Sequence, residues 1–465
     1  MNILYHIMKN FSIITLGCKV NQYESQQIRQ LLGQLGLTQV EISKKPDLIV
    51  VNTCCVTHTA SAKSRQYIHK AQRINPDAVT VICGCLPTVQ IGELSKPAKN
   101  VHLVRHRDNL AAILARMANG NAATSDFQRT QSRKQTIIKA ETNSNFKHKN
   151  KLRNQQDLPQ LTSFKGQTRA FLKVQDGCDG YCSYCIVPRV RPFVQSKPAE
   201  TALQEAKSLV EAGHKEIVVT GIFLGAYGQE SVRRKTWVGR QNDKLADLLD
   251  KMAQIPNLAR IRLSSLEPAD VTPQLLDVFC KHRNIMPHLH LSLQSGSNAV
   301  LKRMCRQYTV EEFREKVELI KSRLDRPSIT TDIIVGFPGE TDADFQQTID
   351  LAKEVGFSKM HVFSFSRRKG TAAAVMQDAV DNRVIKKRSR MLRDLNVELG
   401  RTYRQQFVGE TAEILVENNN GRVCGRSERY FMVCLNESGE KPARNELVRV
   451  KLVENSENGM IGETQ

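Results

Sequence analysis

The sequence predicts an α/β protein in three parts: a small parallel α/β N-terminal domain, a partial (β/α)6 barrel and a C-terminal antiparallel β-barrel. The chain has 465 residues, enough for two to four domains at roughly 100–200 residues each. Short apolar runs alternate with stretches of helical spacing over most of the chain, which is typical of parallel sheets. Near the C-terminus the runs become short and alternating, which favours an antiparallel barrel.

The N-terminal domain is expected to span residues 10–122. Apolar runs at residues 11–16, 48–51 and 79–82 predict buried parallel strands, and helical spacing at 25–37 and 61–74 fills the gaps between them. Each run leads into a turn that carries a cysteine. Functional residues gather at the carboxyl ends of parallel strands, so we expect a site at that edge of the sheet.

Residues 123–163 are predicted to form a basic linker. The stretch 128–153 holds eight Lys/Arg residues against one acid, Glu141, and is poor in apolar residues. This composition predicts a solvated, flexible tether, with an RNA-binding arm as the alternative.

The central part, residues 164–400, repeats the strand–helix alternation on a larger scale. Helical patterns, such as those at 199–212 and 310–324, lie between the apolar runs. Six strands in this alternation predict an incomplete barrel. The expected strands are residues 170–174, 216–221, 260–264, 288–292, 328–335 and 359–365.

The last part, residues 401–460, carries short alternating runs such as 411–417 and 447–453. Between them lies the turn sequence Asn418-Asn419-Asn420-Gly421. The pattern predicts the small antiparallel barrel.

Composition narrows the classes of function. Lys and Arg number 68 against 47 Asp and Glu, a balance of +21 that points to a polyanionic partner, most simply nucleic acid. No stretch supplies the roughly 20 apolar residues of a membrane span, and no signal peptide is expected at the N-terminus. We expect the chain to be cytoplasmic, and in a cytoplasmic chain of this length twelve cysteines are more typical of metal or cluster ligands than of disulfides.

The strongest motif is the run of Cys178, Cys182 and Cys185, directly after a predicted strand. Structural zinc takes four protein ligands, and no fourth Cys or His follows at the expected spacing. Three cysteines fit a [4Fe–4S] cluster with one iron open to an exogenous ligand. Three buried thiols without a cluster are the alternative.

Cys18, Cys54 and Cys85 each follow a predicted strand of the N-terminal domain. Adjacent strands of a sheet lie about 5 Å apart, so the three thiolates can meet at its edge and hold a second cluster. Scattered core cysteines are the alternative.

The loop with three cysteines resembles that of the radical S-adenosylmethionine (SAM) superfamily. The resemblance implies a partial (β/α)6 barrel in which SAM chelates the open iron and is cleaved to a 5′-deoxyadenosyl radical. It makes Cys178, Cys182 and Cys185 catalytic. Matching segments at later strand ends imply SAM contacts at Gly221, Ser265, Glu267, Gln294 and Asp332.

The whole arrangement is similar to the methylthiotransferases of that superfamily, with a C-terminal TRAM domain, an OB-like RNA-binding barrel. This resemblance implies two [4Fe–4S] clusters and SAM as cofactors. The cluster at Cys18, Cys54 and Cys85 would carry the sulfur. Cys55 stands where relatives usually have Thr, and Cys83 is an extra thiol; both are predicted to pack in the core. Cys280, Cys305, Cys424 and Cys434 have no motif around them.

The segments 52–57 and 63–66 are most similar to the branch that modifies threonylcarbamoyladenosine (t6A) in tRNA. The sequence does not distinguish t6A from its cyclic form as the substrate. The stretch 367–370 departs from that branch, which usually has proline there. The alternatives are isopentenyladenosine in tRNA, an aspartate of a ribosomal protein, and a non-enzymatic Fe–S protein that binds RNA.

The implied partners are the tRNA anticodon loop, a flavodoxin-like or similar electron donor, and a sulfur donor that the sequence does not reveal; no membrane partner is expected. Residues 381–404 support RNA binding, because eight Lys/Arg against three acids give a local balance of +5. A solvated helix face is the alternative. The target base must leave its stack to enter a barrel, which favours a loop base.

Overall fold

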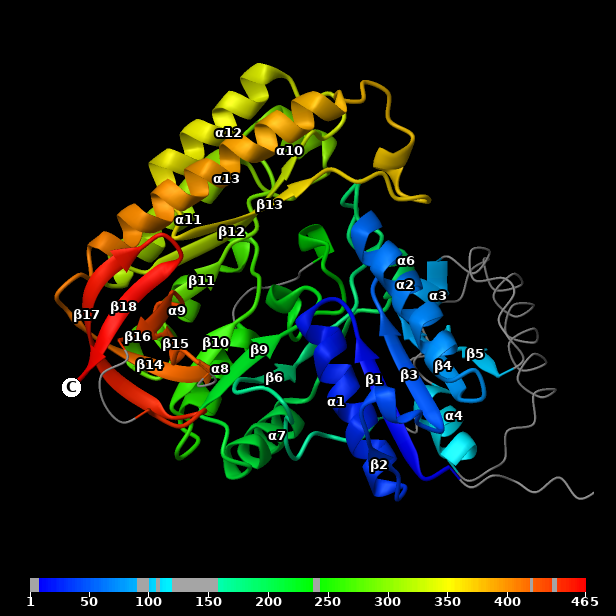
Figure 1. Cartoon of the computed structure of the whole chain (residues 1–465). Helices are drawn as coiled ribbons and strands as arrows, with labels where there is room; N and C mark the ends of the chain where they lie inside the picture. Colours follow the sequence, from blue (N-terminus) through cyan, green and yellow to red (C-terminus); the bar gives the residue numbers. More distant parts are fainter. Residues whose placement is uncertain are drawn as a thin grey trace, which may run out of the picture. The chain divides into compact units, whose positions relative to one another are not determined.

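The computed structural model describes residues 8–89, 100–105, 109–118, 158–236, 243–418, 421–436 and 441–465 (Figure 1). The chain divides into two compact units, residues 1–55 with 59–160, and residues 56–58 with 161–465. The predicted basic linker lies outside the described residues up to Leu158, where they resume. Among the helices that the structure describes, none has both the length and the apolar character needed to cross a bilayer.

The first unit is built on a wholly parallel five-stranded sheet with the order β2-β1-β3-β4-β5. The three predicted strands are confirmed, and β2 and β5 are short edge strands that leave little apolar pattern. The strands are β1 (Asn10–Thr15), β2 (Thr38–Gln39), β3 (Leu48–Thr53), β4 (Val79–Gly84) and β5 (Val101–Leu103). The helices are α1 (Lys19–Gln34), η1 (Ile42–Lys44), α2 (His58–Ile74), α3 (Leu86–Val89) and α4 (Leu110–Ala118).

Helix α1 begins six residues before the helix that apolar spacing predicts. Its first turns bury polar side chains, because they satisfy backbone groups at the strand ends. The Asn21 amide donates to the carbonyls of Leu16 (2.8 Å) and Thr53 (2.9 Å). Apolar side chains such as Ile28 and Leu32 join the core of the unit only further along the helix.

The second unit contains the predicted partial barrel of six parallel strands. Two three-stranded sheets, β6-β9-β10 and β11-β12-β13, are joined by parallel bridges between Ile261 and Ile285 and between Leu266 and Leu291. The six predicted strands are confirmed. They are β6 (Ala170–Lys173), β9 (Glu216–Thr220), β10 (Arg260–Leu263), β11 (His288–His290), β12 (Ser328–Val335) and β13 (Lys359–Ser364). A small hairpin, β7 (Gln175–Asp176) with β8 (Gln195–Ser196), follows β6.

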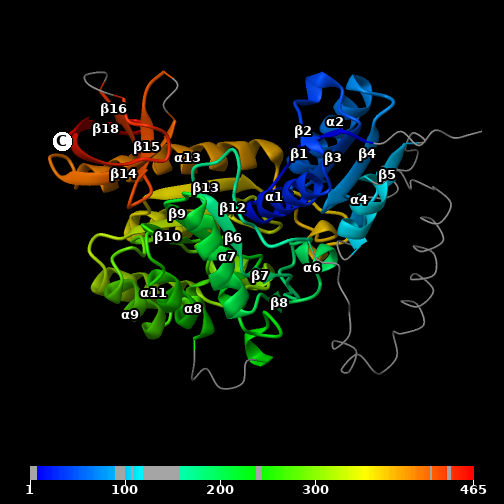
Figure 2. The same ribbon diagram turned by 90° about the horizontal axis from the view of Figure 1, so that it is seen from below.

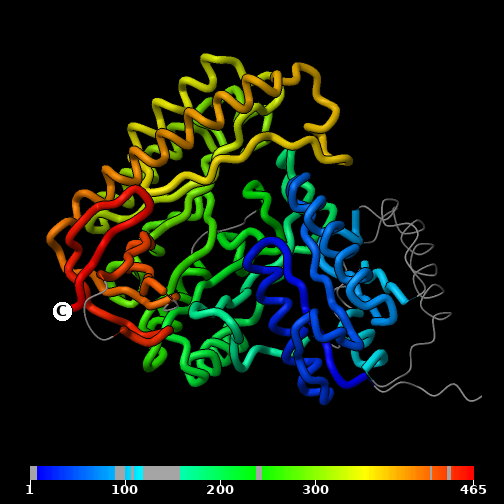
Figure 3. The backbone as a smooth tube through the Cα atoms, in the orientation of Figure 1, coloured from blue at the N-terminus to red at the C-terminus, as the bar shows by residue number. Residues whose placement is uncertain are grey.

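Helices line the outer side of these strands (Figure 2). The main ones are α7 (Ala199–Glu211), α8 (Lys244–Ala253), α9 (Pro273–Lys281), α11 (Val310–Arg323) and α12 (Asp342–Val355). Shorter ones are α6 (Val187–Val190), η4 (Leu224–Ala226), η5 (Arg234–Thr236), η6 (Pro268–Asp270), α10 (Asn298–Arg303) and η7 (Ala372–Ala374). The backbone trace leads from β13 through the long helix α13 (Asn382–Gln405) into the terminal barrel (Figure 3).

The terminal domain is a closed five-stranded barrel with the order β14-β15-β16-β18-β17. The predicted barrel is confirmed: four of its pairings are antiparallel, and β16 and β18 run parallel. An odd number of strands cannot alternate in direction around a closed ring, so at least one parallel pair is required. The strands are β14 (Thr411–Asn418), β15 (Cys424–Ser427), β16 (Met432–Leu435), β17 (Leu447–Ser456) and β18 (Gly459–Thr464).

Cys424 and Cys434 are opposite residues of β15 and β16 and form a disulfide. They are therefore cross-strand partners, whereas the sequence alone shows no motif around either. The terminal barrel is fixed to the amino ends of the central strands. Buried Arg260 donates to the carbonyl of Glu413 (2.6 Å), and buried Arg262 donates to that of Ser427 (2.6 Å).

Candidate functional site

The turn after β7 carries what we call the loop cysteines: Cys178, Cys182 and Cys185. Gly177, just before them, has a φ of +77°, and a Cβ there would lie 1.7 Å from the carbonyl oxygen of Phe193. Glycine is therefore required for the sharp turn into the loop. The Cys178 N–H donates to the carbonyl of Arg191 (2.8 Å), which fixes the start of the loop.

Each loop cysteine sulfur accepts a hydrogen bond. The donors are the Gly180 N–H to Cys178 Sγ (3.3 Å), Arg306 to Cys182 Sγ (3.1 Å) and the Val187 N–H to Cys185 Sγ (3.4 Å). Burial raises the pKa of the Cys178 and Cys185 thiols to about 12. Thiolates at these positions therefore need a cationic partner. Three thiol ligands with N–H donors to sulfur fit an iron–sulfur cluster.

A buried network of charged side chains contacts Cys182. The Arg306 guanidinium donates to Glu267 Oε1 (2.5 Å) as well as to Cys182, and it lies 4.9 Å from the centre of the Tyr308 ring. Glu267 Oε2 accepts from Arg234 (3.1 Å). Both oxygens of this carboxylate therefore have guanidinium donors, which makes it an anchor for Arg306. Sequence reasoning missed both arginines, because no local motif surrounds them.

Asp179 holds the loop from the other side. Its carboxylate accepts from the Val232 N–H (2.8 Å) and the Ser231 hydroxyl (2.7 Å). The Arg233 guanidinium lies 4.4 Å from the centre of the Tyr181 ring, which is 54% exposed. The loop therefore presents an aromatic surface backed by a cation, an arrangement suited to stacking on a base.

The other residues predicted to contact SAM lie at or near the carboxyl ends of β9, β10, β11 and β12. Gly221 follows β9, and a Cβ there would lie 2.9 Å from the Cβ of Gln175, so close packing beside the cysteine turn explains this glycine. Ser265 is exposed in the loop after β10. Gln294 has a φ of +67°, and its N–H donates to the carbonyl of Asp332 (2.8 Å). These roles toward SAM stay predictions.

In the first unit, what we call the edge cysteines, Cys18, Cys54 and Cys85, follow the adjacent strands β1, β3 and β4. A Cβ on Gly17 (φ +100°) would lie 2.9 Å from Cys54 Sγ, so the turn before Cys18 packs directly against the Cys54 thiol. The Cys85 N–H donates to the carbonyl of Thr53 (2.9 Å). The three residues thus share one edge of the sheet, as required of ligands to one cluster.

Cys55 and Cys83 are almost completely buried, with exposures of 0% and 1%. Cys55 Sγ contacts the carbonyl oxygen of Cys85 (3.5 Å), and Cys83 belongs to the apolar core of the unit. These surroundings agree with a packing role. The ligand choice remains a prediction.

The basic residues of helix α13 differ in their exposure. Arg383, Lys386, Lys387, Arg390, Arg393 and Arg401 are exposed. Arg388 is buried instead, and it donates to Glu340 Oε2 (2.6 Å) and Asp342 Oδ1 (2.7 Å). Only the exposed set is available to a polyanion.

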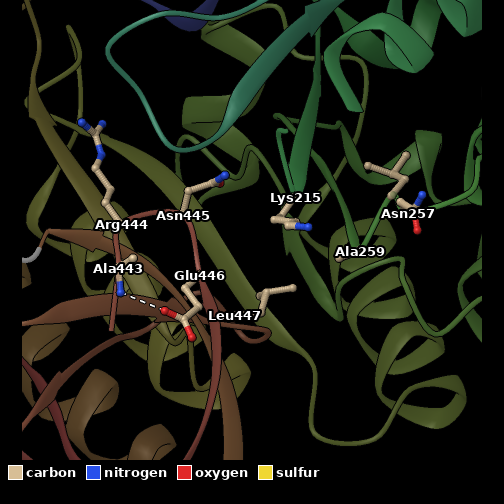
Figure 4. A pocket seen from close by; sticks show the side chains of 9 residues that line it. Lys215, Asn257, Ala259, Ala443, Arg444, Asn445, Glu446 and Leu447 are labelled. Atoms are coloured by element: carbon tan, nitrogen blue, oxygen red, sulfur yellow. Dashed lines mark hydrogen bonds between the residues drawn. The ribbon is translucent and has the colours of Figure 1, made fainter. Parts of the chain in front are cut away.

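A pocket of about 670 Å³ lies at the opposite end of the central strands from the loop cysteines. Lys215 and Ala259 line it just before β9 and β10, and Arg444 and Asn445 line it from the terminal barrel (Figure 4). Arg444 donates to the carbonyl of Gly166 (2.9 Å) and Asn445 to that of Gly213 (2.8 Å). The polar groups of this pocket thus join the two barrels.

The fold and the loop cysteines define a radical SAM protein, and known families agree. The Radical SAM superfamily matches residues 172–352, and Uncharacterized protein family UPF0004 matches residues 10–105. The solved structure of the radical S-adenosylmethionine methyltransferase TsrM from Kitasatospora setae has a TM-score of 0.54 and 14% identity, covering 79% of this chain and 77% of that one. That likeness shows the fold alone.

Sequence relatives define the family more closely. The threonylcarbamoyladenosine tRNA methylthiotransferase MtaB of Chlamydia pneumoniae is 36% identical over 97% of both chains. That of Bacillus subtilis is 34% identical over 96% of this chain and 94% of its own. The tRNA-2-methylthio-N(6)-dimethylallyladenosine synthase of Finegoldia magna is 30% identical over 97% and 94%. This chain belongs to the radical SAM methylthiotransferases, so it is an enzyme whose cofactors are SAM and [4Fe–4S] clusters.

Proposed function

We propose that this enzyme adds a methylthio group at C2 of threonylcarbamoyladenosine, next to the anticodon of tRNA. The observation that carries the proposal is near-full-length similarity to relatives named for that reaction, at 34–36% identity. Relatives named for the dimethylallyl substrate reach 30–31%.

The loop cysteines would ligate the cluster that binds SAM, and the edge cysteines would ligate the cluster that carries sulfur. When bound, SAM and the clusters supply the hydrogen-abstracting radical and the sulfur, which protein side chains cannot provide. The chain's own residues position these groups. Arg306 donates to Cys182, Glu267 fixes Arg306, and Asp179 fixes the loop against the segment 231–233.

RNA would contact the exposed cations of α13 and the terminal barrel, which we propose is the TRAM domain. Phosphate contacts by exposed lysines and arginines give affinity without sequence information. Of the five predicted SAM contacts, we retain Gly221, Ser265 and Gln294 as proposed contacts. Glu267 is instead proposed to anchor Arg306, and Asp332 to face the substrate. A low-potential, flavodoxin-like electron donor, a separate sulfur donor and a cytoplasmic location complete the proposal.

Mass spectrometry of tRNA nucleosides from a deletion strain tests the proposal. The methylthio derivative of threonylcarbamoyladenosine should disappear while its precursor accumulates, and the intact gene should restore it. A variant with Cys182→Ala should not restore it, whereas Cys280→Ala, an exposed cysteine outside both sets, should. Loss of the methylthio group from isopentenyladenosine instead would contradict the proposed substrate.

A further inference from the structure

The inner face of β12 carries a polar cluster around Asp332, a residue for which the sequence predicts a SAM contact. Along a strand, Asp332 and Ile334 point to one face, and Val335 points to the other. Ser364, the register partner of Val335, bonds Ser389 of α13 (3.2 Å), so α13 covers the second face. Asp332 and Ile334 therefore face the inside of the partial barrel.

Two imidazoles lie beside Asp332 on this inner face. His361 of β13 is its register partner, and His290 of β11 places Nε2 3.4 Å from Asp332 Oδ2. The two rings are 5.8 Å apart, and one ligand atom from each of the three residues lies within 4.8 Å of the others. The Thr330 hydroxyl lies 2.9 Å from His290 Nδ1, which orients that ring. We call these three residues the inner cluster.

Side-chain packing and hydrogen bonds connect the inner cluster to the loop cysteines. Tyr184, inside the cysteine loop, packs against the same apolar group as Ile334, which is two residues beyond Asp332 on the same face. Two residues of strand span about 7 Å. Tyr308, which contacts Arg306, donates to the carbonyls of Ser292 and Leu293, just beyond His290. A substrate whose reacting carbon faces the SAM site can thus reach the inner cluster with a side group.

The chemistry of the cluster selects the kind of side group. Imidazole N–H groups donate to a carboxylate whether the ring is neutral or charged, and Asp332 accepts from a hydroxyl or an N–H. Phe363, the register partner of Ile334, is 43% exposed on the same face and offers a surface on which a base can stack. An apolar side group would give no partner to the buried Nε2 atom of His290, which has no hydrogen bond among the described residues, and protein sites reject such a mismatch strongly.

We propose that His290, Asp332 and His361 form the subsite for the threonylcarbamoyl group of the target adenosine, with its carboxylate on the imidazoles and its hydroxyl or N–H on Asp332. The inference rests on the proposed function and extends it to the residues that distinguish this substrate from one with a hydrocarbon side group. His361 is the exposed member of the cluster, so it can be replaced with little risk to folding.

The test uses the anaerobically reconstituted enzyme and two anticodon stem-loops, one with threonylcarbamoyladenosine and one with the methylamide of its carboxylate. The wild type should favour the acid in kcat/KM. In His361→Leu, the ratio of kcat/KM for the acid to kcat/KM for the methylamide should fall roughly 10- to 100-fold, the usual cost of losing a hydrogen bond to an ionised group. The fall should come from a raised KM for the acid. His361→Gln, which keeps a donor, should retain part of it. His282→Leu, at a His–Asp pair on the helical side, is the matched control and should keep the preference.

Rates are normalised to 5′-deoxyadenosine formation without RNA, which corrects for any loss of clusters. An unchanged preference in both His361→Leu and Asp332→Asn would overturn the subsite while leaving the proposed function intact. A raised KM for SAM in Asp332→Asn, with the RNA KM unchanged, would overturn it in favour of a SAM contact. If the wild type bound one zinc or iron in addition to the cluster irons, and His361→Leu or Asp332→Asn lost it, the inner cluster would be a metal site and the proposed subsite would be overturned. Inactive wild type on the threonylcarbamoyl stem-loop, with SAM cleavage present, would refute the proposed function itself.

Discussion

Replacing Arg306 with methionine should make the reduction potential of the cluster at the loop cysteines more negative. Arg306 is buried between Cys182 Sγ and Glu267, at 3.1 and 2.5 Å. A positive donor beside a ligand sulfur stabilises the reduced cluster, which carries one more negative charge. A hydrogen bond from a charged group contributes about 1.5–3 kcal/mol. For one electron this corresponds to a shift of about 60–130 mV at most.

The same substitution should not unfold the barrel. Breaking a buried ion pair costs about 3–5 kcal/mol when one charge is left alone. Here Arg234 still pairs with Glu267 at 3.1 Å, so the carboxylate keeps a partner and the loss of stability should fall below that range. Arg306→Lys keeps the charge and should shift the potential less than methionine does.

Anaerobic potentiometric titration followed by electron paramagnetic resonance measures the shift. The edge cysteines are replaced in every sample, so that one cluster gives the signal. Arg314→Met is the matched control, because Arg314 pairs with Glu354 at 2.8 Å on the exposed surface. An unchanged potential in Arg306→Met with full iron content would refute the reasoning.

Three further predictions concern other parts of the chain. Replacing the loop cysteines with alanine should halve the iron content and abolish SAM cleavage. Replacing the edge cysteines should also halve the iron content, but SAM cleavage should continue without methylthio transfer. Iron analysis and measurement of 5′-deoxyadenosine check both variants. Replacing Lys386, Lys387 and Arg390 with glutamine should flatten the salt dependence of tRNA affinity by roughly 0.7–0.9 per lost phosphate contact, while Lys353→Gln on α12 should not. Burial lowers the pKa of His214, whose Nε2 accepts from the Phe164 N–H (3.1 Å). Protonation therefore favours the unfolded state, so thermal stability should fall as the pH drops below about 6.5, and His214→Gln should reduce that slope.

The charge count of residues 381–404 overstates the number of cations available to RNA, because burial removes some of them from the surface. Arg388 belongs to a run of basic residues, but its guanidinium is bound to Glu340 and Asp342. It should therefore be excluded from any test of RNA binding. The terminal barrel also depends on such buried ions, because Arg260 and Arg262 donate to its carbonyls.

Features that depend on local spacing could be predicted from the amino-acid sequence. These features are the three cysteines within one turn, the apolar runs of strand length, and the single cysteines directly after such runs. The order of the strands in the sheet then brings the edge cysteines together. Contacts between side chains that are distant in the sequence could not be predicted and are seen in the folded chain. Arg306 reaches Cys182 across 124 positions, and His290, Asp332 and His361 come together from three strands. Such contacts depend on the register and the packing of side chains, which impose no pattern on neighbouring residues.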